Sequence, residues 1–144
     1  MQSRSQRIEN IFKNLRADTM HLLDSFYAQD VVFEDPLGSL NGLEDLRAYY
    51  MHLYSGATTV DFDFSDEICV ENKHVVFWTM SFQSKRLNAG RTISVIGNSK
   101  IVFDDESNLV MYHRDFFDMG AMIYEHLPLI GWLNRKVKQK LTTH

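Results

Sequence analysis

The first 56 residues repeat their apolar positions mainly with the period of an α-helix. An apolar face with spacing i, i+3, i+4, i+7 is formed by Ile8, Ile11, Phe12 and Leu15. A second helix, capped by Asp18 or Thr19, is predicted from the apolar positions Leu22, Leu23, Phe26 and Tyr27. Asn41 and Glu44 have the spacing of a capping box, so they open a third predicted helix, which ends at Gly56. Between the second and third helices, residues 31–34 read as a strand and residues 35–38 as a turn.

From residue 60 the period changes from 3.6 to 2, which is typical of β-strands. Val60, Phe62 and Phe64 alternate with aspartates. Three longer strands are predicted at residues 74–84, 91–103 and 109–118, and the short polar segments between them favour antiparallel hairpins. After Gly120 the helical period returns and predicts a helix at about residues 120–141.

Helices followed by long antiparallel strands predict an α+β fold. Such a sheet twists and curves, so helices packed on one face close one end of it and leave a cavity at the other. The 144 residues show no shift in composition, and a single domain spanning residues 1–144 is expected.

Composition narrows the expected partners and location. A net charge of −4 does not favour nucleic acid or an anionic membrane. The single cysteine fits a reducing compartment, no apolar run approaches the ~20 residues of a membrane span, and the first residues do not resemble a signal peptide, so a cytoplasmic location is expected. With no glycine-rich phosphate loop and no metal-ligand spacing, no cofactor or metal is expected.

The segment FYAQDVVFEDPLGSLNG and the order of elements resemble the nuclear-transport-factor-2-like superfamily. This superfamily includes SnoaL-like polyketide cyclases, ketosteroid isomerases and limonene-epoxide hydrolases. The resemblance runs from about Ile8 to Leu127, and it implies a cone-shaped, cystatin-like fold with the curved sheet wrapped around the N-terminal helices. Because the fold carries many activities, it does not by itself give the function.

Two local similarities imply catalytic carboxylates. Glu34-Asp35-Pro36 with Gly38 resembles the ketosteroid isomerase segment that carries the general base, which falls on Asp35. Arg114-Asp115-Phe116-Phe117-Asp118 resembles the final strand of the limonene-epoxide hydrolases, where an aspartate, here Asp115, helps to activate water. The same resemblance implies a homodimer that associates through sheet faces.

The chain departs from both families at other positions. Ile11 and Ser99 stand where the isomerases use a tyrosine and a protonated aspartic acid as oxyanion hole. Met80 and Phe82 stand where the hydrolases use a charged pair, and Phe33 replaces a water-holding tyrosine. The chain therefore retains one catalytic carboxylate of each family, and its predicted cavity is more apolar than the cavity of the hydrolases.

Strand geometry orders the candidate residues. Asp35 follows Phe33 on one face of its strand and is expected to point into the cavity, although an Asp-Pro pair is also a common turn element. On the last strand, Leu109, Met111, His113, Asp115 and Phe117 share one face, and the hydrolase similarity selects it as the inner one. The isomerase similarity would select the opposite face, which carries Arg114, unless a bulge shifts the register by one residue. The hydrolase similarity is preferred, because its local identity is stronger. Asp118 then reads as a helix cap and Arg114 as an ion-pair partner outside the cavity. The predicted ligand-binding residues are Phe33, Tyr50, Trp78, Met80, Phe82, His113 and Phe117.

The leading hypothesis is a pocket for a small hydrophobic molecule, with Asp35 and Asp115 available for proton transfer or hydration. The alternative is a non-enzymatic binding or interaction module of the same fold. The basic, amphipathic segment LIGWLNRKVKQKLTTH reads first as a terminal helix packed on the domain, and second as a membrane-surface helix.

Overall fold

The computed structural model describes residues 1–57, 59–83 and 90–118 of the chain. Its elements, in chain order, are α1 (Arg4–Asn14), the 3₁₀-helix η1 (Met20–Ser25), β1 (Tyr27–Asp35), β2 (Gly38–Asn41), α2 (Leu43–Ser55), β3 (Thr59–Val70), β4 (Lys73–Gln83), β5 (Ile93–Phe103) and β6 (Val110–Phe117). The helix predicted at 120–141 lies outside the described residues. No helix in the described ranges is long and apolar enough to cross a membrane.

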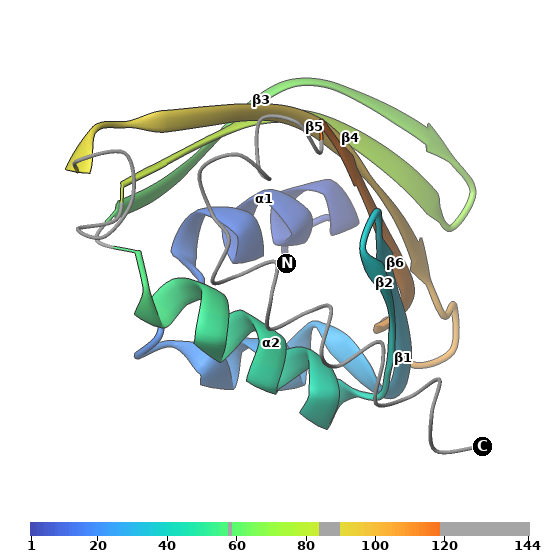
Figure 1. Ribbon diagram of the computed structural model, residues 1–144. Coiled ribbons are helices and arrows are strands. Elements are labelled where there is room, and N and C mark those ends of the chain that lie inside the picture. Colours follow the sequence, from blue (N-terminus) through green and yellow to red (C-terminus); the bar gives the residue numbers. More distant parts are fainter. Residues whose placement is uncertain (58, 84–89, 119–144) are drawn as a thin grey trace.

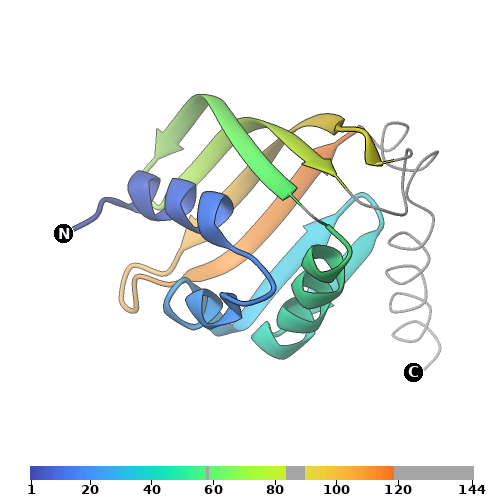
Figure 2. The same ribbon diagram turned by 90° about the vertical axis from the view of Figure 1, so that its left-hand side faces the viewer.

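The described strands form one curved six-stranded sheet in the order β2-β1-β6-β5-β4-β3. Figure 1 and Figure 2 show α1 and α2 on its concave side. The predicted α+β class and the curved sheet wrapped around helices are confirmed. The expectation of a wholly antiparallel sheet is wrong at one pair, because β1 and β6 run parallel. All the remaining strands of the sheet lie between these two in sequence, so no short hairpin restricts their relative direction.

Helix α1 is held by its cap and by its apolar face. The Ser3 side chain accepts a hydrogen bond from the backbone N–H of Gln6, and the Gln6 side chain accepts one from the N–H of Ser3, which completes a capping box. Ile8, Ile11 and Phe12 are buried toward the sheet, as their spacing predicts. The helix thereby places Phe12 and Ile11 over the concave face.

The second predicted helix is shorter than its apolar pattern indicates. Only Met20–Ser25 is helical, as a 3₁₀-helix, and Tyr27 already belongs to β1. The backbone of Val110 donates to the carbonyl of Phe26, and Tyr27 pairs with Val110 across the parallel β1–β6 ladder. Pairing with β6 therefore overrides the local helical spacing, and the first strand begins four residues earlier than predicted.

The start of α2 also differs from the prediction. Gly42, not Asn41, is the N-cap residue, and no side chain caps the helix. Asn41 pairs with Val32 in the short antiparallel β2, a segment that includes part of the predicted turn. The chain then turns at Gly42 with φ +94°, a backbone conformation that favours glycine.

The last strands run as predicted, in antiparallel pairs from β3 to β6. Gly97 of β5 lies directly opposite Trp78 of β4. A Cβ atom on Gly97 would come within 2.5 Å of both the Trp78 ring and the carbonyl oxygen of Phe116. The absent side chain of Gly97 therefore gives the indole its place on the concave face.

Candidate functional site

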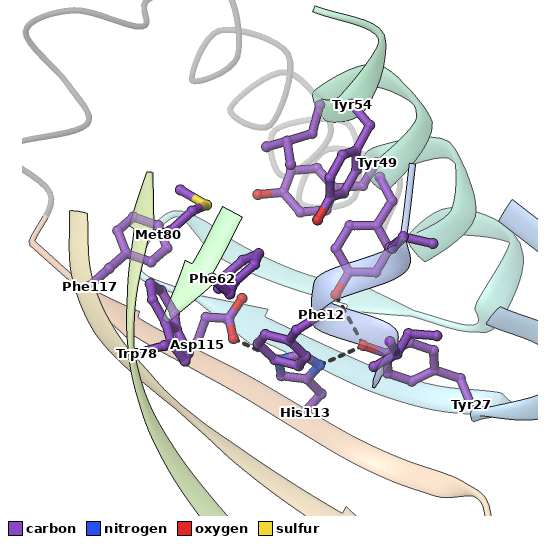
Figure 3. A pocket seen from close by; sticks show the side chains of 14 residues that line it. Phe12, Tyr27, Tyr49, Tyr54, Phe62, Trp78, Met80, His113, Asp115 and Phe117 are labelled. Carbon is purple, nitrogen blue, oxygen red and sulfur yellow. Dashed lines mark hydrogen bonds and ion pairs between the residues drawn. The ribbon is translucent and has the colours of Figure 1, made fainter. Parts of the chain in front are cut away.

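A pocket lies between the helices and the concave face of the sheet (Figure 3). Its walls come from α1, β1, α2, β3, β4 and β6, and its lining consists of Ile11, Phe12, Leu15, Tyr27, Tyr49, Tyr50, Leu53, Tyr54, Phe62, Trp78, Met80, His113, Asp115 and Phe117. The cavity volume open to the centres of water molecules is about 70 Å³. One water needs roughly 10–15 Å³ by this measure, so the pocket has room for a small organic molecule.

The pocket brings together six of the nine residues predicted from the sequence. Asp115 and five of the predicted ligand-binding residues line it: Tyr50, Trp78, Met80, His113 and Phe117. Asp35, Phe33 and Phe82 are buried but are not among its lining residues. Asp115 is the carboxylate in an otherwise mainly aromatic and aliphatic lining.

Phe33 supports the wall from behind rather than forming its surface. Its ring centroid is 5.0 Å from the ring of His113 and 5.6 Å and 6.0 Å from the rings of Tyr49 and Tyr50. Since Phe33 pairs with His113 across the β1–β6 ladder, its ring fills the space beneath the imidazole. Phe82, 5% exposed, is part of the core in the same way.

Asp115 is held on the pocket wall by hydrogen bonds to one of its two oxygens. Its Oδ1 accepts from the Ser99 hydroxyl at 2.6 Å and lies 2.6 Å from His113 Nε2. Ser99 is directly opposite Asp115 in the β5–β6 ladder, and its Oγ in turn accepts from Trp78 Nε1 at 2.9 Å. Figure 3 shows the other carboxylate oxygen of Asp115 directed toward Phe62 rather than toward His113. One oxygen of Asp115 is thus fixed and the other faces the pocket.

The hydrogen bonds on the other side of His113 extend to two tyrosines. His113 Nδ1 lies 2.8 Å from the Tyr27 hydroxyl (Figure 3). The Tyr27 hydroxyl lies 3.1 Å from the Tyr50 hydroxyl. An ionised Asp115 only accepts, so a neutral His113 carries its proton on Nε2 and accepts at Nδ1 from Tyr27. Tyr27 then accepts from Tyr50. Every donor in this hydrogen-bond network points toward the Asp115 carboxylate, and this direction fixes the imidazole tautomer.

The buried phenols stay protonated at neutral pH. Burial raises the pKa of Tyr27, Tyr49 and Tyr50 above the ordinary value for a phenol, and the nearby Asp115 charge raises it further. Tyr27 and Tyr50 therefore act as hydrogen-bond donors in the network. Sequence reasoning missed Tyr27, because the helical spacing placed it on a helix rather than beside His113.

Asp35 occupies a different environment from the one predicted. Its Oδ1 accepts from the backbone N–H groups of Leu37, at 2.8 Å, and Gly38, at 3.2 Å, and its Oδ2 accepts from the Tyr49 hydroxyl at 3.3 Å. Burial raises its pKa to about 6, although the backbone donors act in the opposite direction. The carboxylate therefore turns back onto the β1–β2 turn, and Tyr49 separates it from the pocket. Asp35 is not among the residues that line the pocket with Asp115.

On β6, the predicted alternation of inner and outer residues holds only from His113 onward. Met111 is 41% exposed and Val110 is buried, the reverse of the predicted alternation. The register of the β5–β6 ladder shifts between Val102 and Phe103, so one extra residue separates the buried Val110 from His113. Beyond the bulge, His113, Asp115 and Phe117 share the pocket face as predicted.

Arg114 points to the opposite side of the strand. Its guanidinium lies 3.0 Å from a carboxylate oxygen of Glu34, which also accepts from the Tyr112 hydroxyl. The predicted ion-pair role outside the cavity therefore agrees with the structure. Within the described residues, no group of three His, Cys, Asp or Glu side chains could hold a metal ion.

Comparison with solved structures identifies the same fold in proteins with different activities. A candidate SnoaL-like polyketide cyclase from Shewanella denitrificans OS-217 is 18% identical, with a TM-score of 0.72 over 84% of this chain and 94% of that one. The BvnE pinacolase from Penicillium brevicompactum is 15% identical, with a TM-score of 0.69 over 83% and 84%. An LEH-like epoxide hydrolase from M. tuberculosis is 13% identical, with a TM-score of 0.65 over 83% and 84%.

These identities are too low to transfer an activity, and they establish the fold alone. No curated protein is significantly similar to the chain. The family model of the SnoaL-like domain matches residues 8–107, which is more than half of the sequence. The chain therefore belongs to the SnoaL-like family.

Proposed function

We propose that this protein binds a small, largely apolar carbonyl compound in its pocket and transfers a proton on it, with Asp115 as the general base. The observation that carries the proposal is the position of the Asp115 carboxylate on the wall of an apolar pocket, with Ser99 and His113 both bonded to Oδ1. Oδ2 then remains to take a proton from the bound molecule. Asp115 replaces Asp35 as the first candidate, since Asp35 is engaged by its own turn.

The surrounding side chains suit such a step. Trp78, Met80 and Phe117 form an apolar wall around Asp115, which favours a hydrophobic molecule and keeps water away from the reacting atoms. The network fixes the carboxylate in one orientation, so no reorganisation is needed when the proton moves. A positioned base of this kind accelerates proton transfer by about 100- to 10,000-fold.

Hydrogen exchange on carbonyl compounds tests this function directly. Apolar cyclic ketones are incubated with the protein in D₂O, and the loss of the hydrogens next to the carbonyl is followed by proton NMR. We expect exchange with the wild-type protein and a decrease of at least about 100-fold in Asp115→Asn. Binding of the same ketones, measured by thermal shift, should persist in this variant because the apolar lining is unchanged.

Asp35→Asn is the matched control, because it makes the same chemical change at a buried carboxylate outside the pocket lining. It should retain exchange within a few-fold of wild type. Exchange that survives Asp115→Asn, or that is lost equally in Asp35→Asn, would contradict the proposed role of Asp115. Binding of the ketones without exchange by the wild-type protein would instead favour the alternative, a non-enzymatic binding module.

A further inference from the structure

A second group of reactive side chains lies outside the pocket, on the β3–β4 hairpin. Cys69 of β3 is paired directly opposite His74 of β4, and Glu67 lies two residues before Cys69 on the same strand. Cys69 is exposed and is the one cysteine in the sequence. His74 is buried, with only 4% of its surface accessible. None of the three residues lines the pocket, so the proposed function does not use them.

The hydrogen bonds in this cluster are ordered by the carboxylate. Glu67 Oε1 lies 2.8 Å from His74 Nδ1 and also accepts from the Ser5 hydroxyl at 2.9 Å. Since an ionised Glu67 only accepts, a neutral His74 carries its proton on Nδ1, which leaves the lone pair on Nε2. That nitrogen lies 3.6 Å from the Cys69 sulfur. The thiol thus faces a base whose tautomer is already correct for taking its proton.

The buried imidazole is also fixed in position. Its ring packs edge-on against Phe103, with centroids 5.5 Å apart, and Arg4 and Arg7 lie over the same phenyl ring. The Cys69 thiol can also donate to the carbonyl oxygen of Glu71, which lies 3.8 Å from the sulfur. A nucleophile, a base within reach of it and a third group that orients the base are the three parts of an activated thiol. Exposure of the sulfur adds access for a small reagent.

We propose that Cys69 is a modification site that forms a mixed disulfide with small disulfides, with His74 as the base and Glu67 as the positioning residue. His74 Nε2 takes the thiol proton, and the Cys69 thiolate attacks one sulfur of the incoming disulfide. A new S–S bond forms to Cys69, the S–S bond of the reagent breaks, and the reagent's second sulfur leaves as a thiolate that is then protonated. Cys69 is oxidised and the leaving half of the reagent is reduced.

The size of the expected acceleration follows from two opposing effects. The thiolate is the nucleophile, so a base that accepts the thiol proton as the sulfur attacks speeds the reaction. A sulfur that shares its proton with a base is also a weaker nucleophile than a free thiolate, which removes part of that gain. The net acceleration expected from the base is about threefold at neutral pH.

The single cysteine makes the test site-specific. The full-length protein is mixed with dithiobis(nitrobenzoate), an aromatic disulfide that releases a coloured thiolate, and the rate is measured at pH 7. We expect His74→Gln to react about threefold more slowly than wild type, because the amide takes no proton from the thiol. Glu67→Gln should also slow the reaction, because the imidazolium loses its carboxylate partner. Glutathione disulfide should add one glutathione to wild type, as measured by intact mass.

Two further variants keep the result interpretable. His21→Gln removes an exposed histidine outside the cluster and should react at the wild-type rate. If the buried His74→Gln does not fold by circular dichroism, the part-exposed Glu67→Gln decides the question. A rate in Glu67→Gln equal to wild type, or a rate in folded His74→Gln equal to or above wild type, would overturn the proposal. So would a wild-type protein that gains no glutathione.

Discussion

Hydrogen-bond partners, rather than residue type, determine whether a buried aspartate of this protein belongs to a turn or to the pocket wall. Asp35 and Asp115 are both partly or fully buried carboxylates, yet Asp35 accepts from the backbone of its own turn and Asp115 accepts from side chains of the pocket wall. Burial raises the pKa of Asp35 to about 6. Ionisation of Asp35 therefore lowers the free energy of unfolding of the protein.

Asp35→Asn should stabilise the protein at neutral pH. The folded pKa lies about two units above that of an unfolded aspartate, so the folded state holds the proton more tightly, and stability falls as pH rises from about 4 to about 6. Above this window the ionised carboxylate costs about 2–3 kcal/mol. Asparagine keeps an acceptor for the N–H groups of Leu37 and Gly38 without ionising.

Urea unfolding of wild type and Asp35→Asn at several pH values measures this effect. The difference in unfolding free energy should be largest above about pH 6 and should shrink toward zero below about pH 4, where Asp35 is protonated in both states. A variant less stable than wild type at pH 7, or a difference independent of pH, would show that the ionisation of Asp35 does not control the stability at this position.

At the scale of elements, the pairing of β5 with β4 on one side and with β6 on the other positions the pocket wall. Gly97 allows the Trp78 indole to lie over β5, and from there Trp78 donates to Ser99, which holds Asp115. Three strands therefore cooperate to orient one carboxylate. A side chain at position 97 would disturb the contacts among all three strands.

Gly97→Ala should destabilise the protein by about 1–3 kcal/mol, because its methyl group would come within 2.5 Å of backbone and ring atoms. The displaced indole should also release Ser99, so ketone-dependent hydrogen exchange should fall. Stability is measured by urea unfolding followed by far-UV circular dichroism. Gly56→Ala is the matched control, since its Cβ would meet only a carbonyl oxygen at 3.8 Å. Equal stability of the two variants would contradict the packing role of Gly97.

On the scale of the whole molecule, the sheet has one face covered by helices and an outer face that carries apolar side chains. Ile96 is 74% exposed and Phe116 is 42% exposed. Phe116 pairs with Asn98, which lies two positions after Ile96 on the same face of β5, so the side chains of Ile96 and Phe116 are diagonal neighbours. Exposed apolar groups gathered on one surface favour association. We propose that two copies of the chain associate through this outer face.

Light scattering during size-exclusion chromatography tests the association. Wild type should elute with the mass of two chains, and Ile96→Glu should elute with the mass of one, because a buried unpaired charge would oppose the contact. Met51→Glu, on helix α2 at the concave side of the sheet, makes the same kind of change at another exposed apolar residue and should leave the dimer intact. A monomeric wild-type protein would exclude this contact.

Much of the fold was predictable because periodicity is a local property of the chain. The face of α1 and the alternation along β3 to β5 are determined by the spacing of apolar residues, and the structure confirms them. Tyr27 was assigned wrongly, since its spacing fits a helix and only pairing with β6 makes it part of a strand. The bulge before His113 is equally invisible in the pattern, because it depends on the register of β5 against β6.

The sequence by itself determined the α+β class, the SnoaL-like resemblance, and five of the pocket's apolar and aromatic positions together with Asp115. The class and the resemblance depend on the order of elements along the chain, and the pocket positions depend on residue type and on spacing within one helix or strand. Only the tertiary structure decided which carboxylate faces the pocket, because Asp35 and Asp115 differ in contacts made by other elements. It also decided that Tyr27 reaches His113 from β1 and that Cys69 faces His74 across a hairpin. Such contacts depend on strand register, which no single segment of the sequence contains.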